Sequence, residues 1–131
     1  MHSVIPSVRF RDLDAAVDFY VNTLGFEIVR GTPGDGNVAV SHGPARLMLE
    51  AAGEFYGAPY NEEIRARLAS PPAHSLYLEE PELEAYYARL QDAGVRVVDP
   101  LAERPWGQAE FTVEDSGGNW LSFWRATPPP A

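Results

Sequence analysis

The chain has 131 residues, of which 45% are hydrophobic and 22% charged, a composition typical of a single folded domain with its own core. Its formal net charge of -9 argues against nucleic acid and anionic membranes as partners, and the lack of cysteine excludes disulfides, thiolate metal sites and a cysteine nucleophile. There is no basic and apolar leader and no run of ~20 apolar residues, so we expect a cytoplasmic protein.

The first half predicts one helix among short strands. Asp12 or Asp14 can cap a helix that runs to about Thr23, and Gly25 ends it. Strands are predicted at 4–10, 26–30, 38–41 and 46–51. Turn-forming clusters separate the last three strands, so we expect them to form a meander.

The second half repeats this order after a connector at 54–72, which contains a short helical piece at 62–68. A helix is then predicted at about 81–93. Strands are predicted at 74–78, 95–98, 109–114 and 120–125. Because the halves share one pattern, we predict a single domain built by duplication. Its parts are a first module at 1–53, a second module at 73–126 and a frayed tail at 127–131.

Several short motifs follow one another in a fixed order along nearly the whole chain. They are 6–13, 19–20, 24–26, His74, Trp106-Gly107, Phe111 and 115–119. Their order and spacing resemble the vicinal oxygen chelate superfamily, which includes glyoxalase I, extradiol dioxygenases, fosfomycin-modifying enzymes and bleomycin resistance proteins. The resemblance implies an α+β fold of two βαβββ modules that form an incomplete eight-stranded mixed barrel, usually in a homodimer. The modules pair either within one chain or between two.

The resemblance also implies four metal-ligand positions, on the first and fourth strand of each module. In this sequence they fall on Ile5, Glu50, His74 and Ser122. Ile5 has no donor atom and Ser122 is a poor ligand, whereas a stable divalent site needs three or four protein ligands such as imidazole and carboxylate. We therefore expect no metal cofactor, with His74 and Glu50 as the only candidates for a remnant site.

Strand alternation gives the same register as the motif spacing. If Glu50 and His74 face the concave side, the helices cover Leu47, Leu49, Phe111, Val113, Leu121 and Phe123. The concave side then receives Ile5, Ser7, Arg9, Arg46, Met48, Glu50, His74, Leu76, Glu110, Thr112, Trp120, Ser122 and Trp124. This mixed lining of aromatic and charged groups suits an organic molecule.

Some of these residues also have structural explanations. His74 and Glu50 form a buried polar pair, contact a ligand, or hold a metal, in decreasing order of expectation. Arg9 and Arg46 are expected to neutralise Glu50 or Glu110, because an unpaired buried carboxylate is costly.

Large aromatic side chains occur where no core pattern requires them. Trp106 lies in a proline-containing loop, and Phe55, Tyr56 and Tyr60 lie in the connector. They are candidate ligand walls, and the equal alternative is that they close the barrel ends or fill a dimer interface.

Two functions follow. The first is a bleomycin-resistance-like protein that sequesters an organic ligand, aromatic or cationic, without catalysis and without a complete metal site. Its expected binding residues are Glu50, His74, Trp106, Phe55, Tyr56, Tyr60, Arg46, Glu110, Trp120 and Trp124. The second is an enzyme, either a metal-dependent lyase, isomerase or dioxygenase that uses His74 and Glu50, or a metal-free catalyst that uses them as base and acid. A small dimeric regulator or immunity-like module is a third possibility.

Overall fold

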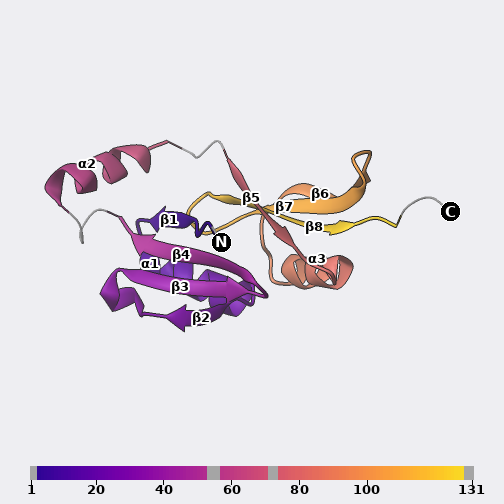
Figure 1. Cartoon of the computed structure of the whole chain (residues 1–131), viewed down its shortest axis with the longest axis horizontal. Coiled ribbons are helices and arrows are strands. Elements are labelled where there is room, and N and C mark those ends of the chain that lie inside the picture. The colour runs from indigo at the N-terminus through magenta and orange to yellow at the C-terminus, as the bar shows by residue number, and fades with distance from the viewer. Residues whose placement is uncertain (1–2, 53–56, 71–73, 129–131) are drawn as a thin grey trace. The chain divides into compact units, whose positions relative to one another are not determined.

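The computed structural model describes residues 3–52, 57–70 and 74–128, which form two compact units, Met1–Pro71 and Pro72–Ala131. Each unit contains one four-stranded mixed sheet with a helix packed on it (Figure 1). The predicted α+β fold with a duplicated βαβββ module is therefore confirmed. No helix within the described ranges is both long enough and apolar enough to span a membrane.

The first unit has strand order β1-β4-β3-β2, in which β1 runs parallel to β4 and the other neighbours are antiparallel. Its elements are β1 (Ser7–Phe10), α1 (Leu13–Asp18), the π-helical turn η1 (Phe19–Thr23), β2 (Glu27–Arg30), the short 3₁₀ turn η2 (Pro33–Asp35), β3 (Asn37–His42), β4 (Ala45–Ala51) and α2 (Ala58–Arg67). The predicted meander of the second, third and fourth strands is confirmed.

Helix α1 begins where the sequence predicts, because the Asp12 carboxylate accepts a hydrogen bond from the Ala15 amide at 3.0 Å. Its apolar side packs on the sheet around Tyr20, whose ring makes edge contacts with Phe10 at 6.0 Å and with Phe26 at 5.3 Å. All three rings are at most 2% exposed, so they form the core of the first unit.

The second unit has the equivalent order β5-β8-β7-β6, with β5 parallel to β8. Its elements are β5 (Ser75–Glu79), α3 (Leu83–Asp92), β6 (Val97–Arg104), β7 (Gln108–Glu114) and β8 (Trp120–Ala126). Tyr86 of α3 packs against Phe123 at 4.9 Å, and Phe123 stacks on Phe111 at 5.5 Å. These rings form the core between α3 and its sheet.

Strand β1 begins at Ser7 rather than at residue 4, and α2 and β6 are longer than predicted. Helix α2 begins at Ala58 rather than near residue 62, because Pro59 occupies its first turn, where proline is tolerated. Strand β6 continues to Arg104, although Pro100 interrupts it. The strand lies at the sheet edge and its register shifts between Asp99 and Ala102, and at such irregular positions proline costs no ladder hydrogen bond.

Gly31 after β2 is a position where a side chain cannot be accommodated. Its φ is +87°, and a Cβ atom there would lie 2.4 Å from the Asn37 carbonyl oxygen. We expect Gly31→Ala to lower the free energy of unfolding by about 2 kcal/mol or more, because the left-handed backbone and the clash both oppose it. Urea denaturation measures the loss.

Gly43 provides the matched control, since its φ is +56° but a Cβ there would meet nothing within 4 Å. Gly43→Ala should cost only the backbone term, about 1 kcal/mol. Equal losses in the two variants would show that the close approach to Asn37 is unimportant.

Candidate functional site

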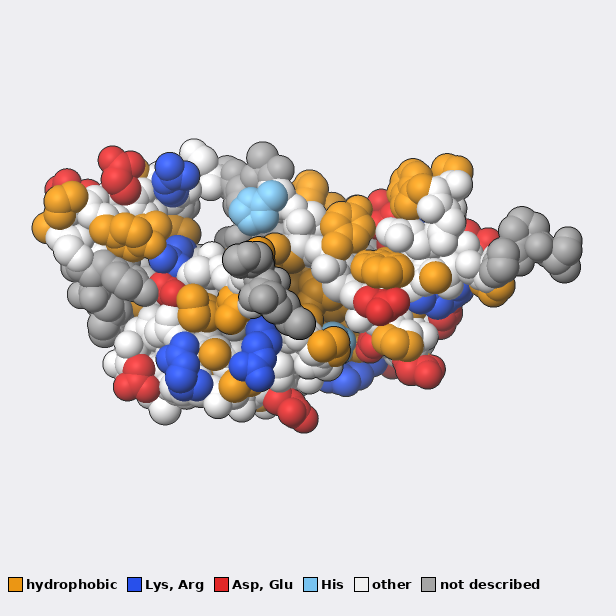
Figure 2. Space-filling model, viewed as in Figure 1, with side chains coloured by type: hydrophobic (Ala, Val, Ile, Leu, Met, Phe, Trp, Pro, Cys, Tyr) orange, Lys and Arg blue, Asp and Glu red, His pale blue; other side chains and the backbone are white. Residues whose placement is uncertain are grey.

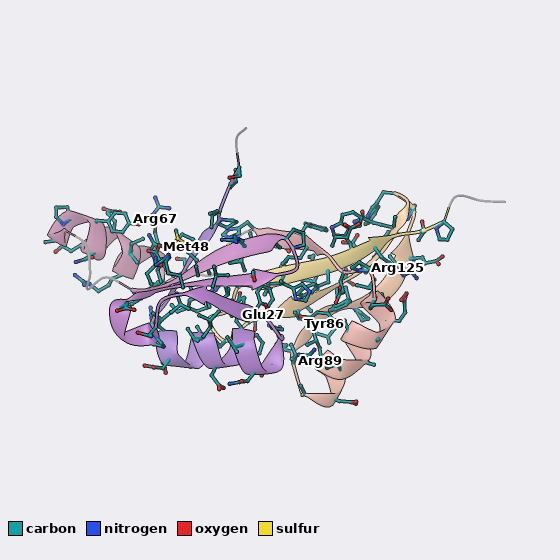
Figure 3. The ribbon with its side chains drawn as sticks, turned by 60° about the horizontal axis from the view of Figure 1, so that its bottom comes forward. Glu27, Met48, Arg67, Tyr86, Arg89 and Arg125 are labelled. Carbon is teal, nitrogen blue, oxygen red and sulfur yellow. The ribbon has the colours of Figure 1, made fainter. Side chains whose placement is uncertain are left out.

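Strand register gives each sheet a helix-facing side and an opposite side. In the first unit, Val8 pairs with Leu49, and both are buried on the α1 side. The alternating residues Arg9 and Glu50 pair on the opposite side, as does Met48 with Ser7. Figure 3 shows Met48 on β4, on the sheet side away from α1.

An ion pair occupies this opposite side of the first sheet. Glu50 is only 3% exposed, and an Arg9 guanidinium nitrogen lies 2.8 Å from its Oε2. The Asn37 amide donates to its Oε1 at 2.8 Å. Arg9 also donates to the Tyr60 hydroxyl, and its guanidinium lies 5.6 Å from the centroid of the Tyr60 ring. The predicted neutralisation of Glu50 by Arg9 is confirmed, and both Glu50 oxygens already accept hydrogen bonds.

The second sheet presents a different set of side chains away from α3. Leu78 pairs with Phe123 on the helix side, whereas Tyr77 pairs with Ser122 on the opposite side. Ser122 in turn pairs with Thr112, and Trp124 with Glu110, so all of these share one face. We call Tyr77, Trp106, Glu110, Thr112 and Ser122 the Glu110 cluster.

Glu110 is a nearly buried carboxylate, 4% exposed, held by neutral donors. The Trp106 indole donates to its Oε1 at 2.8 Å. The hydrogen bond between the Tyr77 hydroxyl and Glu110 raises the pKa of Tyr77, and partial desolvation and the Glu110 charge raise it further. Within residues 74–128 of its own unit, no Arg or His nitrogen lies within 4 Å of the Glu110 oxygens. The partners of Glu110 shown within its unit are therefore two neutral groups.

Glu114 on the same strand shows the usual alternative. Arg96 lies 2.6 Å from its Oε2, and the Trp120 indole donates to its Oε1 at 3.2 Å. The hydrogen bond from Arg96 holds the pKa of Glu114 below its ordinary value. Of the two arginines predicted to neutralise Glu50 or Glu110, Arg9 pairs with Glu50.

A chain of hydroxyl groups leads to Glu110 from the interior of the sheet. The Ser122 Oγ lies 2.7 Å from both Ser75 Oγ and Thr112 Oγ1. Its hydrogen bond with Tyr77 opposes the rise in the pKa of that phenol. Ser122 therefore links Ser75, Thr112 and Tyr77 and orders the cluster.

Accessible aromatic rings lie at this carboxylate, in Trp106 and Tyr77, and elsewhere on the same sheet, in Trp120 and Trp124. Trp106 is 64% exposed, Tyr77 59% and Trp120 42%, whereas Trp124 is half-buried. Figure 2 shows hydrophobic side chains exposed over both units. Exposed rings beside a carboxylate that lacks a cation can bind a flat, positively charged organic group by stacking, by cation–π contact and by direct ion pairing.

A sequence model of the glyoxalase/bleomycin resistance protein/dioxygenase superfamily matches residues 2–123. The chain belongs to this superfamily. No curated protein sequence matches it at a significant level.

Several solved structures resemble this chain over nearly its whole length. TioX from Micromonospora sp. ML1 aligns with a TM-score of 0.74 and 22% identity over 99% of this chain and 100% of its own. UcmS2 aligns with a TM-score of 0.73 and 27% identity over 95% and 98%. The bleomycin-binding protein from bleomycin-producing Streptomyces verticillus, solved with copper(II)-bleomycin, aligns with a TM-score of 0.65 and 25% identity over 98% of each chain.

The superfamily's metal-ligand positions hold residues that do not fit a divalent ion. Ile5 lacks a donor, and Glu50 already accepts from Arg9 and Asn37. In the second unit, Ser75 and not His74 lies on the same side of the sheet as Ser122, and the two hydroxyl groups are bonded to each other. Across the described parts of the chain, no three His, Cys, Asp or Glu side chains gather where they could hold a metal ion. A neutral hydroxyl pair is a poor replacement for imidazole or carboxylate.

The predicted placement of β5 is wrong by one residue. Leu76 pairs with Leu121 and therefore faces α3, not the concave side. His74 precedes β5 and is exposed, so it is not a buried polar residue. The predicted ligand walls Phe55 and Tyr56 lie outside the described residues. Tyr60 lies on α2, 43% exposed, with its hydroxyl bonded to Arg9.

Two residues of these sites are not among those that the sequence predicts. Tyr77 could be found from Leu76 and Leu78, the apolar residues on either side of it, which indicate the register of β5. Nothing in the sequence indicates the bond between Asn37 and Glu50. Arg46 of β4 is exposed on the same side as Glu50, and within the described residues it makes no ion pair.

Proposed function

We propose that this protein sequesters a planar aromatic cation at the Glu110 cluster without transforming it. The observation that carries the proposal is the Glu110 carboxylate, 4% exposed, bonded to the Trp106 indole and the Tyr77 phenol and paired with no cation within residues 74–128 of its unit. A buried charge is costly until a counter-charge meets it, so a ligand cation gains the full strength of the pairing.

The charge of the second unit supports a cationic ligand. Residues 72–131 contain ten carboxylates and four arginines. Such an excess raises the local concentration of cations and speeds their association. It also disfavours anionic ligands at the Glu110 cluster, because they would approach against the field.

Sequestration is better supported than catalysis. Ser122 is the central hydroxyl of the cluster, but its oxygen is already bonded to Ser75, Thr112 and Tyr77. A lyase, isomerase or dioxygenase that uses His74 and Glu50 is less well supported, since His74 is exposed outside its strand and Glu50 is bonded to Arg9 and Asn37. The bleomycin-binding similar structure, at 25% identity, adds an example of a binding function on this fold.

Isothermal titration calorimetry at pH 7 tests the proposal with two flat molecules of similar shape, 9-aminoacridine, which is cationic, and acridone, which is neutral. We expect saturable binding of the cation and binding of the neutral compound weaker by about tenfold or more, because only the cation pairs with Glu110. Bleomycin, with and without copper(II), is a third titrant because of the similar structure noted above.

Mass spectrometry of the recovered ligand separates sequestration from catalysis. An unchanged ligand mass after prolonged incubation supports sequestration. A product of different mass would refute sequestration and indicate an enzymatic function. Equal affinity for 9-aminoacridine and acridone would refute the role of Glu110. Sedimentation of the free and ligand-bound protein tests the accompanying prediction of a homodimer.

A further inference from the structure

A cavity in the first unit has two arginines in its lining. Its volume is about 280 Å³, and it is lined by Arg11, Ala52, Arg65 and Leu68. This volume is below that of typical drug-sized ligand sites, so it suits a small group. These four residues belong to the first unit, so they have no part in the function proposed for the Glu110 cluster of the second unit.

Local structure brings the two arginines together. Arg11 and Ala52 follow the paired ends of the parallel strands β1 and β4, and the Ala52 amide donates to the Phe10 carbonyl at 2.8 Å. Arg65 and Leu68 are three residues apart at the end of α2, so they lie on one side of that helix. The strand ends and the last helical turn therefore form opposite walls of the cavity.

The Arg11 guanidinium is held in place at the cavity. One of its nitrogens donates to the Leu68 carbonyl at 3.1 Å. Arginine has five N–H donors, so this bond fixes the planar group while leaving most donors available. Fixing the side chain before binding reduces the entropy that a ligand must overcome. Asp12, the adjacent carboxylate in the sequence, accepts from the Ala15 amide at the start of α1.

We propose that this cavity binds a phosphate group, with Arg11 and Arg65 as its two charged ligands. Two planar guanidinium groups match the charge of a phosphate dianion and can each donate two parallel hydrogen bonds to its oxygens. Arginine is favoured over lysine for this geometry, and all ten basic residues of the chain, leaving histidine aside, are arginines. The phosphate is either free or carried by an organic molecule.

Calorimetric titration of the full chain at fixed ionic strength tests the site with inorganic phosphate and with phenyl phosphate. We expect saturable binding of both, with Arg65→Gln weakening it by about tenfold, because one charge-assisted pair is lost. Tighter binding of phenyl phosphate assigns the site to a phosphate carried by an organic molecule, and equal or tighter binding of inorganic phosphate assigns it to the free ion.

Arg67→Gln is the matched control, since Arg67 is an exposed arginine of the same helical turn that does not line the cavity (Figure 3). It removes the same charge from the other side of α2 and should change affinity by less than about twofold. Arg11→Lys keeps the charge but loses the planar fork, and we expect it to weaken binding several-fold with unchanged far-UV circular dichroism. Absence of saturable binding, or equal weakening by Arg65→Gln and Arg67→Gln, would overturn the proposal.

Discussion

Glu110→Gln is expected to weaken binding of 9-aminoacridine by about 2 kcal/mol, or roughly 30-fold in Kd, and to leave acridone binding nearly unchanged. Glutamine keeps the size of the side chain and one oxygen that can accept from the Trp106 indole. It removes the charge, which we infer to be the ligand's counter-ion. Calorimetry measures this difference directly, because it does not depend on the fluorescence of Trp106, which the substitution itself would change.

Glu114→Gln is the control for the change in overall charge. Glu114 lies on the same strand but is already paired with Arg96 at 2.6 Å. Its substitution should therefore change the binding free energy of 9-aminoacridine by less than about 0.5 kcal/mol, apart from the small effect of the altered net charge. If both variants lose affinity equally, the field of the whole unit attracts the ligand and Glu110 has no special part in it.

Phe123→Ala should remove about 3 to 5 kcal/mol from the free energy of unfolding. Phe123 is 0% exposed and lies between Phe111 at 5.5 Å and Tyr86 at 4.9 Å, so truncation leaves a cavity between β8 and α3. Domains of this size are stable by about 5 to 15 kcal/mol, so a loss of this size is a large fraction of the total. Urea denaturation followed by near-ultraviolet circular dichroism reports the loss of these aromatic contacts.

Phe123→Leu is the comparison variant, because leucine fills most of the same volume without the ring contacts. We expect its loss to be at most about half that of the alanine variant. A loss below about 1.5 kcal/mol for Phe123→Ala would mean that the second unit collapses around the missing ring.

The sequence predicts the architecture well because duplication and apolar periodicity are long-range patterns. The six residues assigned to the helix sides include Leu49 and Phe123, both 0% exposed. The prediction fails at β5, where His74 suggested a register one residue away from the one adopted. The buried pairing of Leu76 with Leu121 and of Leu78 with Phe123 outweighs the local motif, because a shift by one residue would expose both leucines.

The candidate site was predicted only in part. Trp106 and Glu110 were both expected at a ligand site, but their mutual hydrogen bond depends on the tight turn between β6 and β7, where a longer loop was predicted. Arg9 pairs with Glu50 because β1 lies beside β4, which places the two residues opposite each other. Such partners are selected by tertiary packing, so residue spacing alone does not identify them.

The contact between Ser75 and Ser122 has a consequence for how this protein could change over time. In the second unit each hydroxyl satisfies the other at 2.7 Å, and Ser122 also engages Thr112. Replacing Ser75 by histidine would remove one bond from Ser122, which keeps Thr112, whereas replacing Ser122 would take a partner from both Ser75 and Thr112 inside a packed sheet. Each single replacement is therefore expected to weaken the fold, and the one at Ser122 more than the one at Ser75.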